Sequence, residues 1–257
     1  MRPLLNVHVA NTLNIGDLVC APALYFRGLR ARIVDIERLA AVRDLPGCDV
    51  ILGGGGLFGN AYFDEFLATL SADPRTRIAV WGAGTNTHDT DAVAYPPLLD
   101  RIGPVGVRDW DCGREWVPCA SCMSPEFDRP RKIRHEAVIY EHARFPIAIE
   151  GLPRQQNFRR RFWHTFRRTL DFIGSGETVI TSSYHGAYWG VLLGRKVVAV
   201  PYANKFGTLK YPFAVCEGSD WSAAAARAET HPGALRECRE TNVRFAQRVG
   251  EYFATTP

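Results

Sequence analysis

Hydrophobic residues in the first half of the chain fall into short, β-branched runs separated by longer stretches with helical spacing. The short runs predict five strands, over residues 4–9, 31–36, 49–52, 77–81 and 105–107. The longer stretches predict three helices, over residues 18–30, 61–70 and 91–101. Strand–helix alternation at this spacing is typical of a parallel sheet, so we expect an α/β fold.

The same alternation resumes after residues 116–134, a stretch with three prolines, several arginines and little periodicity. Linkers are often proline-rich and polar, so we predict two domains, residues 1–125 and 126–257. Further strands are predicted over 137–140, 178–181 and 197–200, and helices over 154–172 and 233–253. In the last helix, Leu235, Val243 and Phe245 are expected to face inward.

The predicted helix over residues 154–172 carries an aromatic stripe. Phe158, Phe162, Phe166 and Leu170 recur every four residues, which indicates a core-facing side. Arginines at positions 159–161, 167 and 168 lie off that stripe. We interpret them as a solvated basic face, with a surface for anionic lipid headgroups or a lipid-linked saccharide as the alternative.

Candidate chemistry is concentrated in residues 177–205, which read as strand, tight turn, helix, strand and loop. Ser182 and Ser183 can cap the helix, and Pro201 ends the second strand. Such a crossover places the first turn of the helix at the carboxyl end of the sheet, where open α/β folds bind ligands and the helix dipole favours an anion. His185 in this turn is a candidate acid, base or phosphate clamp, or else a residue that packs or caps.

Two upstream loops are predicted to lie at the carboxyl ends of strands as well. Asn14 and Asp17 follow the first strand, and Asp17 is interpreted either as a helix cap or as a carboxylate that orients or deprotonates a hydroxyl. Gly53 to Gly56 follow the third strand and would allow a ligand to approach the backbone closely, with Gly54 and Gly55 as binding residues. The run matches neither the dinucleotide pattern nor the P-loop, so nucleotide binding is unsupported.

Composition narrows the class of protein. The chain is 46% hydrophobic with a net charge of +4, which suits an anionic substrate and is too small to argue for nucleic acid. No apolar run approaches about 20 residues, and no signal-type segment precedes the first strand. A cytoplasmic location is therefore expected.

The seven cysteines, an odd number scattered through the chain, favour reduced thiols. Cys119 and Cys122 form one Cys-x-x-Cys pair near Cys112, which would supply half a zinc site. A second pair at suitable spacing is missing, because Cys216 and Cys238 are isolated. We predict a structural loop and no metal.

The ordered set of motifs resembles the polysaccharide pyruvyl transferase family. Ser183-Tyr184-His185-Gly186, Pro201 and Lys205-Phe206 stand where that family has its C-terminal signature. The resemblance continues through residues 14–17, 53–56, 82–84 and 107–109 and covers most of the chain. The family often has Arg two residues before the His, and this chain has Ser183 there.

The resemblance implies two Rossmann-like halves facing across a cleft in a GT-B-like fold, with the terminal helix crossing back to the first domain. It also implies transfer of the enolpyruvyl unit of phosphoenolpyruvate onto a sugar of a surface polysaccharide or its lipid-linked precursor, without a further cofactor. His185 and Asp17 would be catalytic, and Arg144, Lys205 and the turn at Ser183, Tyr184 and Gly186 would bind the donor. Asn14 and Asp17 would hold the acceptor.

Two other functions stay open at this point. One is a glycosyltransferase on the same scaffold, which would need contacts to a nucleotide base and ribose. The other is a non-catalytic member that binds a saccharide or a partner, which the serine at position 183 favours. Peripheral association with the inner face of a membrane is compatible with each function, and the oligomeric state is open.

Overall fold

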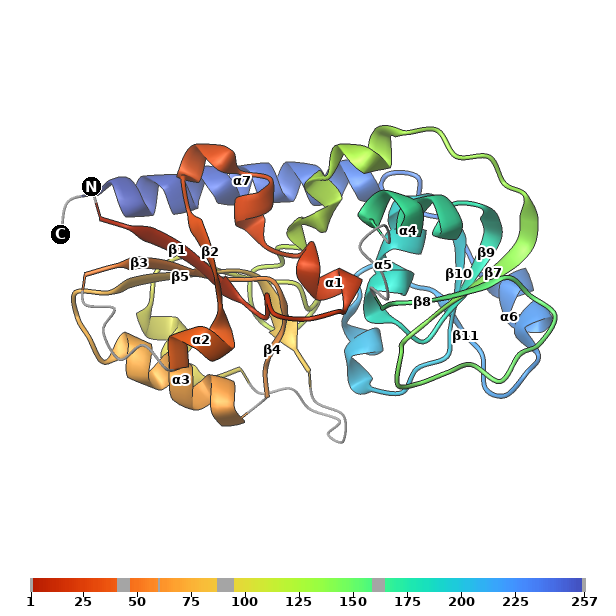
Figure 1. Cartoon of the computed structure of the whole chain (residues 1–257), viewed down its shortest axis with the longest axis horizontal. Coiled ribbons are helices and arrows are strands. Elements are labelled where there is room, and N and C mark those ends of the chain that lie inside the picture. Colours follow the sequence, from red (N-terminus) through yellow and green to blue (C-terminus); the bar gives the residue numbers. More distant parts are fainter. Residues whose placement is uncertain (1, 41–46, 60, 87–94, 159–164, 256–257) are drawn as a thin grey trace. The chain divides into compact units, whose positions relative to one another are not determined.

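Figure 1 shows the computed structural model, which describes residues 2–40, 47–59, 61–86, 95–158 and 165–255. The chain divides into two compact units. Unit 1 comprises Met1–Thr12, Asp17–Met123 and Cys238–Pro257, and unit 2 comprises Leu13–Gly16 and Ser124–Glu237. Each unit is built on a parallel sheet with helices, which confirms the α/β class.

The sheet of unit 1 has the strand order β2-β1-β3-β5-β4, with β6 paired to β5. Its strands are β1 (Leu4–His8), β2 (Arg32–Asp35), β3 (Asp49–Leu52), β4 (Gly55–Phe58), β5 (Arg77–Thr85) and β6 (Val105–Val107). The chain adds β2 on one side of β1 and all later strands on the other, so the strand order reverses between β1 and β3.

Side chains of β3 and β5 alternate between the two faces of this sheet, as the pleat requires. Val50, Leu52, Ile78 and Val80 join a buried cluster with side chains of α3 (Ala61–Ser71) and with Ile36, the first residue of α2 (Ile36–Ala40). On the other face Ile51, Ala79 and Trp81 pack against α7 (Ala234–Ala254) through Phe245 and Val249. Figure 1 shows α2 and α3 on one side of the unit 1 strands and α7 on the opposite side.

The sheet of unit 2 has the order β11-β10-β9-β7-β8, and all its pairings are parallel. Its strands are β7 (His135–Glu141), β8 (Arg154–Gln156), β9 (Gly176–Thr181), β10 (Lys196–Ala199) and β11 (Ala214–Val215). The chain adds β8 on one side of β7 and β9 on the other. The reversal of strand order therefore lies between β7 and β9.

The described residues of unit 2 include the helices α4 (Phe166–Ile173), α5 (Tyr184–Leu192) and α6 (Trp221–Arg227). All nine residues of α5 are buried, which marks it as a core helix rather than an amphipathic surface helix. The short 3₁₀ segments among the residues that the structure describes are η1 (Pro22–Leu24), η2 (Arg27–Leu29), η3 (Pro97–Arg101), η4 (Ala120–Met123), η5 (Pro125–Asp128) and η6 (Asn204–Thr208).

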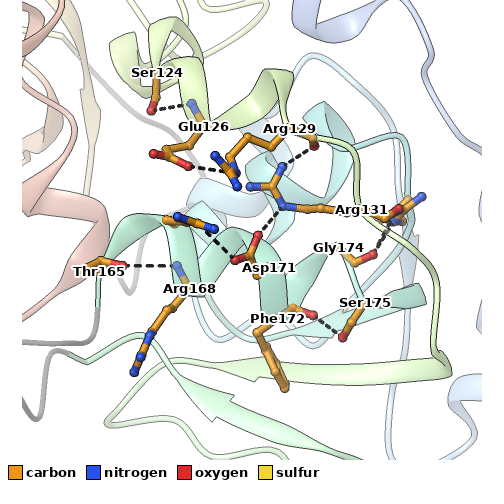
Figure 2. A network of polar contacts seen from close by, with 12 residues as sticks. Ser124, Glu126, Arg129, Arg131, Thr165, Arg168, Asp171, Phe172, Gly174 and Ser175 are labelled. Carbon is orange, nitrogen blue, oxygen red and sulfur yellow. Dashed lines mark hydrogen bonds and ion pairs between the residues drawn. The ribbon is translucent and has the colours of Figure 1, made fainter.

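Arginines fasten the end of α4 to the segment that precedes β7 (Figure 2). Arg131 Nε lies 3.1 Å from Asp171 Oδ1, and its side chain is only 5% exposed. Arg195 donates from Nη2 to the carbonyls of Gly174, at 2.8 Å, and Arg131, at 3.1 Å. Cations are favourable at a helix C-terminus, where carbonyls lack partners within the helix. These contacts join the segments that lead into β7, β9 and β10, at the amino ends of the strands, and are structural.

Two predicted helices are wrong in their extent. The segment 18–30 forms only α1 (Ile15–Leu18), η1 and η2, because Pro22 lacks the N–H that a continuing helix needs. The described part of the segment 154–172 begins as strand β8, which pairs with β7, and its helix, α4, begins at Phe166. Thr165 caps α4 by accepting from Arg168 N at 3.3 Å. Arginines 159–161 and Phe162 lie outside the described residues.

Smaller differences occur elsewhere. The predicted helix 91–101 is a 3₁₀ segment, η3, in its described part, which starts after Pro96, and residues 91–94 lie outside the described residues. Strand β4 was not predicted. In α7 the exposed side chain of Val243, 43% accessible, corrects the prediction that it faces inward, whereas Phe245 is buried. In the described part of the chain, no helix combines the length and apolar composition needed to span a bilayer.

Candidate functional site

The candidate site of unit 2 lies at the carboxyl edge of its sheet, where the strand order reverses. Open parallel sheets bind ligands at such a point, because the connections leave in opposite directions and open a crevice. Three segments emerge there: residues 142–145 after β7, residues 182–185 after β9, and residues 200–206 after β10.

Ser183 is the N-cap of α5, as predicted, and its Oγ accepts from Gly186 N at 3.4 Å. Thr181 Oγ1 accepts from Ser183 N at 3.0 Å, which fixes the turn between β9 and the helix. A Cβ at Gly186 would lie 2.3 Å from Thr181 Oγ1 and 2.7 Å from the Tyr140 ring. Gly186 is therefore required for packing of the first turn against β7 and β9.

His185 occupies the first turn of α5 and is only 4% exposed. Its ring centroid lies 5.1 Å from that of Trp189 and 5.8 Å from that of Tyr184. Gly16 approaches the imidazole closely: a Cβ at this position would lie 2.0 Å from His185 Nδ1. The glycine of the Asn-Ile-Gly-Asp motif thus makes room for the histidine ring.

Asn14 joins the same turn through a network of side chains. Its Oδ1 accepts from Gly16 N at 2.9 Å and from Asn157 Nδ2 at 2.9 Å. Asn157 also donates to Ser183 Oγ at 3.1 Å and accepts from the Tyr140 hydroxyl at 2.9 Å. Sequence reasoning missed Asn157, because it lies in a segment predicted to be helical.

Arg144 is exposed on the loop after β7. This loop is held to the β9 turn by Ser182, whose Oγ accepts from His142 N at 3.0 Å and donates to the carbonyl of Phe145 at 2.6 Å. The structure therefore brings Arg144 to the same edge of the sheet as His185.

Lys205 is 9% exposed and lies in η6. Its Nζ is 4.9 Å from the ring centroid of Tyr202, and that ring stacks on Phe145 with centroids 3.7 Å apart and planes 12° apart. His142 contacts both rings, at 5.2 Å from Phe145 and 5.1 Å from Tyr202. Tyr202 and Phe145 were not singled out from the sequence.

The predicted site residues of unit 1 lie at the carboxyl edge of its own sheet. Asn14, not Asp17, occupies the capping position before α1, so the cap interpretation of Asp17 is wrong. Gly55 has φ +87°, and a Cβ there would lie 3.4 Å from Asp17 Oδ1. A Cβ at Gly54 would lie 2.7 Å from the carbonyl oxygen of Cys20. The glycines thus bring the backbone close to Asp17 and Cys20.

A buried arginine and aspartate lie beside this glycine run. Arg108 Nη2 donates to the carbonyl of Thr85 at 3.2 Å, and Nε is 3.7 Å from Asp109 Oδ1. Asp109 Oδ2 accepts from Thr85 N, at 2.9 Å, from Thr85 Oγ1, at 2.7 Å, and from the Tyr95 hydroxyl, at 2.7 Å. Burial and Asp109 raise the pKa of Tyr95, which keeps this phenol a donor. Arg108 thus pairs with the neighbouring acid, Asp109.

The two cysteines of the Cys-x-x-Cys pair are buried near α7. Cys119 Sγ lies 3.2 Å from Ser121 Oγ, and Cys122 Sγ accepts from Asn242 Nδ2 at 3.4 Å. Burial raises the pKa of Cys119, so this thiol is a poor nucleophile and a poor metal ligand at neutral pH. Among the described residues, no group of three or more Cys, His, Asp or Glu side chains is placed to hold a metal ion.

His8 was missed by sequence reasoning. It is the last residue of β1, next to Asp35 across the β1–β2 register, and is 2% exposed. Its buried Nδ1 has no hydrogen-bond partner among the residues that the structure describes. Burial lowers the pKa of His8 to about 4, against an opposing effect of Asp35. The ring is therefore neutral at physiological pH.

Comparison with known proteins adds little to this geometry. No family model matches the chain, and no curated protein matches it. A solved structure that resembles it is that of a functionally uncharacterized protein from Klebsiella pneumoniae subsp. pneumoniae NTUH-K2044. The two chains share 14% identity with a TM-score of 0.49, over 84% of this chain and 93% of the other.

The contact between Gly16 and His185 gives a first prediction. Gly16→Ala should push the imidazole from its place and destabilise the fold by about 1–3 kcal/mol, the usual effect of overpacking. Gly28→Ala is the matched control, because no described atom lies within 4 Å of a Cβ at that position. Thermal unfolding of both variants checks this, and equal midpoints would show that the ring moves aside without cost.

The second prediction concerns pH. The folded state keeps His8 neutral down to about pH 4, whereas the unfolded chain protonates it near the ordinary histidine pKa of 6.5. Stability should therefore fall by on the order of 3 kcal/mol as the pH drops from 6.5 to 4. His8→Gln should flatten this dependence, and His135→Gln, at an exposed position, should not. Denaturant unfolding at several pH values measures it, and parallel curves for wild type and His8→Gln would contradict it.

Proposed function

We propose that the protein is a ketal pyruvyl transferase, which moves the enolpyruvyl unit of phosphoenolpyruvate onto a sugar. The observation that carries this proposal is the buried His185 in the first turn of α5, at the reversal of strand order in unit 2. A proton donor beside the anion-favouring end of a helix is what the donor substrate requires. The order of motifs along the chain supports the same assignment.

The donor is a phosphate and a carboxylate on one small enol, so its subsite needs several positive groups. The N-terminus of α5 supplies the positive end of a helix dipole. Lys205 and Arg144 lie on the neighbouring segments of the same edge and supply formal charges. They are proposed to supply the positive charge that the family's arginine supplies where this chain has Ser183. Ser183 itself caps the helix, and Tyr184 and Gly186 complete the turn.

The protons balance: His185 gives one to the donor, and the two sugar hydroxyls lose one each, of which one leaves with phosphate and one returns to His185. His185 protonates the methylene carbon C3, which becomes a methyl group and leaves an oxocarbenium-like centre at C2. One sugar hydroxyl attacks C2 and loses its proton. The C2–O bond to phosphate then breaks, phosphate leaves with the electron pair and one proton, and the second hydroxyl attacks C2 and releases its proton to reprotonate the histidine.

The acceptor is proposed to be a sugar of a surface polysaccharide or of its lipid-linked precursor. Asp17, whose Oδ1 lies beside Gly55, is proposed to orient its hydroxyls and to accept a proton. Asn14 contributes by holding the histidine turn through Asn157. The finer fold description, two Rossmann-like halves of a GT-B-like enzyme, is part of this proposal, as is a cytoplasmic site of action. The scheme uses no metal and no further cofactor.

The third prediction tests the acid. His185→Asn keeps some hydrogen bonding and removes the proton, so turnover should fall by about 10²–10⁴. Phosphate release from phosphoenolpyruvate in the presence of methyl pyranosides measures the rate, and mass spectrometry identifies the ketal. The thermal midpoint should stay near that of wild type. Near-normal turnover in a folded variant would remove His185 as the acid, and a collapsed midpoint would indicate a purely structural residue.

The fourth prediction tests the donor subsite. Lys205→Ala should weaken phosphoenolpyruvate binding by about 1.5–3 kcal/mol, the scale of a hydrogen bond to a charged group. Lys196→Ala is the matched control, because Lys196 is the first residue of β10, at the amino end of the strand, and pairs with Glu177 at 3.3 Å. Calorimetry with phosphoenolpyruvate separates the two, and equal affinities would place Lys205 outside the site.

A further inference from the structure

Two aromatic side chains from distant segments stack at the carboxyl edge of unit 2. Phe145 comes from the loop after β7 and Tyr202 from the loop after β10, and their rings are nearly parallel at 3.7 Å. Phe145 is 36% exposed, so this apolar residue is partly accessible to solvent. Exposure of a single apolar side chain is ordinary in proteins. It is informative here only because the stacked pair lies at the carboxyl end of the unit 2 strands, where the candidate site lies.

The stack is fixed in position rather than mobile on its loops. Ser182 holds the backbone on both sides of Arg144, through His142 N and the carbonyl of Phe145. The same Ser182 precedes the cap of α5, so the stack is tied to the turn that carries His185. On the Tyr202 side, Lys205 Nζ lies 4.9 Å from the ring centroid. Because Phe145 covers one face of the Tyr202 ring, the ammonium of Lys205 lies over the other face, and Phe145 forms the opposite end of the stack.

The proposed reaction limits where the acceptor can bind. Both hydroxyls that form the ketal bond to the same carbon of the donor, so the sugar ring carbons end two bonds from C2. A surface that recognises the ring must therefore lie beside the donor subsite. Phe145 directly follows Arg144 in the chain, and the Tyr202 ring contacts Lys205 Nζ, so the stack adjoins two residues of that proposed subsite.

We propose that Phe145, backed by Tyr202, is a stacking platform for the pyranose ring of the acceptor. A pyranose has a face made of C–H groups, which carry partial positive charge and suit the negative face of an aromatic ring. Lys205, on the inner side of the stack, is proposed to bind the donor anion, so one rigid unit would place both substrates. This inference rests on the proposed function for the identity of the sugar as acceptor, and it adds the class of ligand and its subsite.

The experiment measures sugar binding without the donor. Saturation-transfer NMR with methyl β-D-galactopyranoside, methyl β-D-glucopyranoside and methyl β-D-mannopyranoside should show contact to ring C–H protons, and sorbitol, which has no ring face, should show none. Phe145→Ala should weaken binding of the best pyranoside by about tenfold, and Phe145→Trp should retain it. Phosphoenolpyruvate affinity of Phe145→Ala should change by less than about twofold.

Trp110→Ala is the matched control, because Trp110 is another exposed aromatic, at 44%, that pairs edge-to-face with Trp116. Equal pyranoside affinity in wild type and Phe145→Ala, an equal loss in Trp110→Ala, or no binding of any pyranoside would overturn the platform. If pyranoside binding depends on Phe145 but the protein does not bind phosphoenolpyruvate, the stacking platform is supported and the proposed transferase function is contradicted. The two proposals can thus fail separately.

Discussion

The close packing of the first turn of α5 against β7 and β9 is the constraint on which the arrangement of unit 2 depends. Gly186 has no side chain because Thr181 and Tyr140 occupy the space where a Cβ would lie. The helix can therefore approach the sheet until all nine of its residues are buried. A histidine in such a helix is held rigidly, since its neighbours include Trp189 and the backbone of Gly16.

Polar side chains then connect that turn to the segments around it. Ser182 fixes the loop after β7, and Ser183 binds Asn157, which in turn holds Asn14. Buried polar groups are costly unless they are hydrogen-bonded, and these serines and asparagines satisfy one another. The geometry of this candidate site is therefore set by residues that carry no charge, and the charged residues Lys205 and Arg144 lie on the neighbouring segments.

In unit 1 the buried polar groups include a charged pair, Arg108 and Asp109. Arg108 and Asp109 are both nearly inaccessible, and Asp109 is paired with Thr85 and Tyr95. A Cβ at Gly84 would lie 2.5 Å from Arg108 Nε, so this glycine leaves the space that the guanidinium occupies. Breaking such a buried set leaves an uncompensated charge, which is why its members depend on one another.

The sequence alone determined the α/β class, most of the strands, the serine cap of α5 and the terminal helix, because each depends on local periodicity or on a neighbouring side chain. Only the tertiary structure decided that Arg154 starts a strand, since pairing with β7 overrides the helical spacing of Phe158 and Phe166. It also decided the contacts of Gly16 with His185 and of Phe145 with Tyr202. These partners are far apart along the chain, and only the folded structure brings them together.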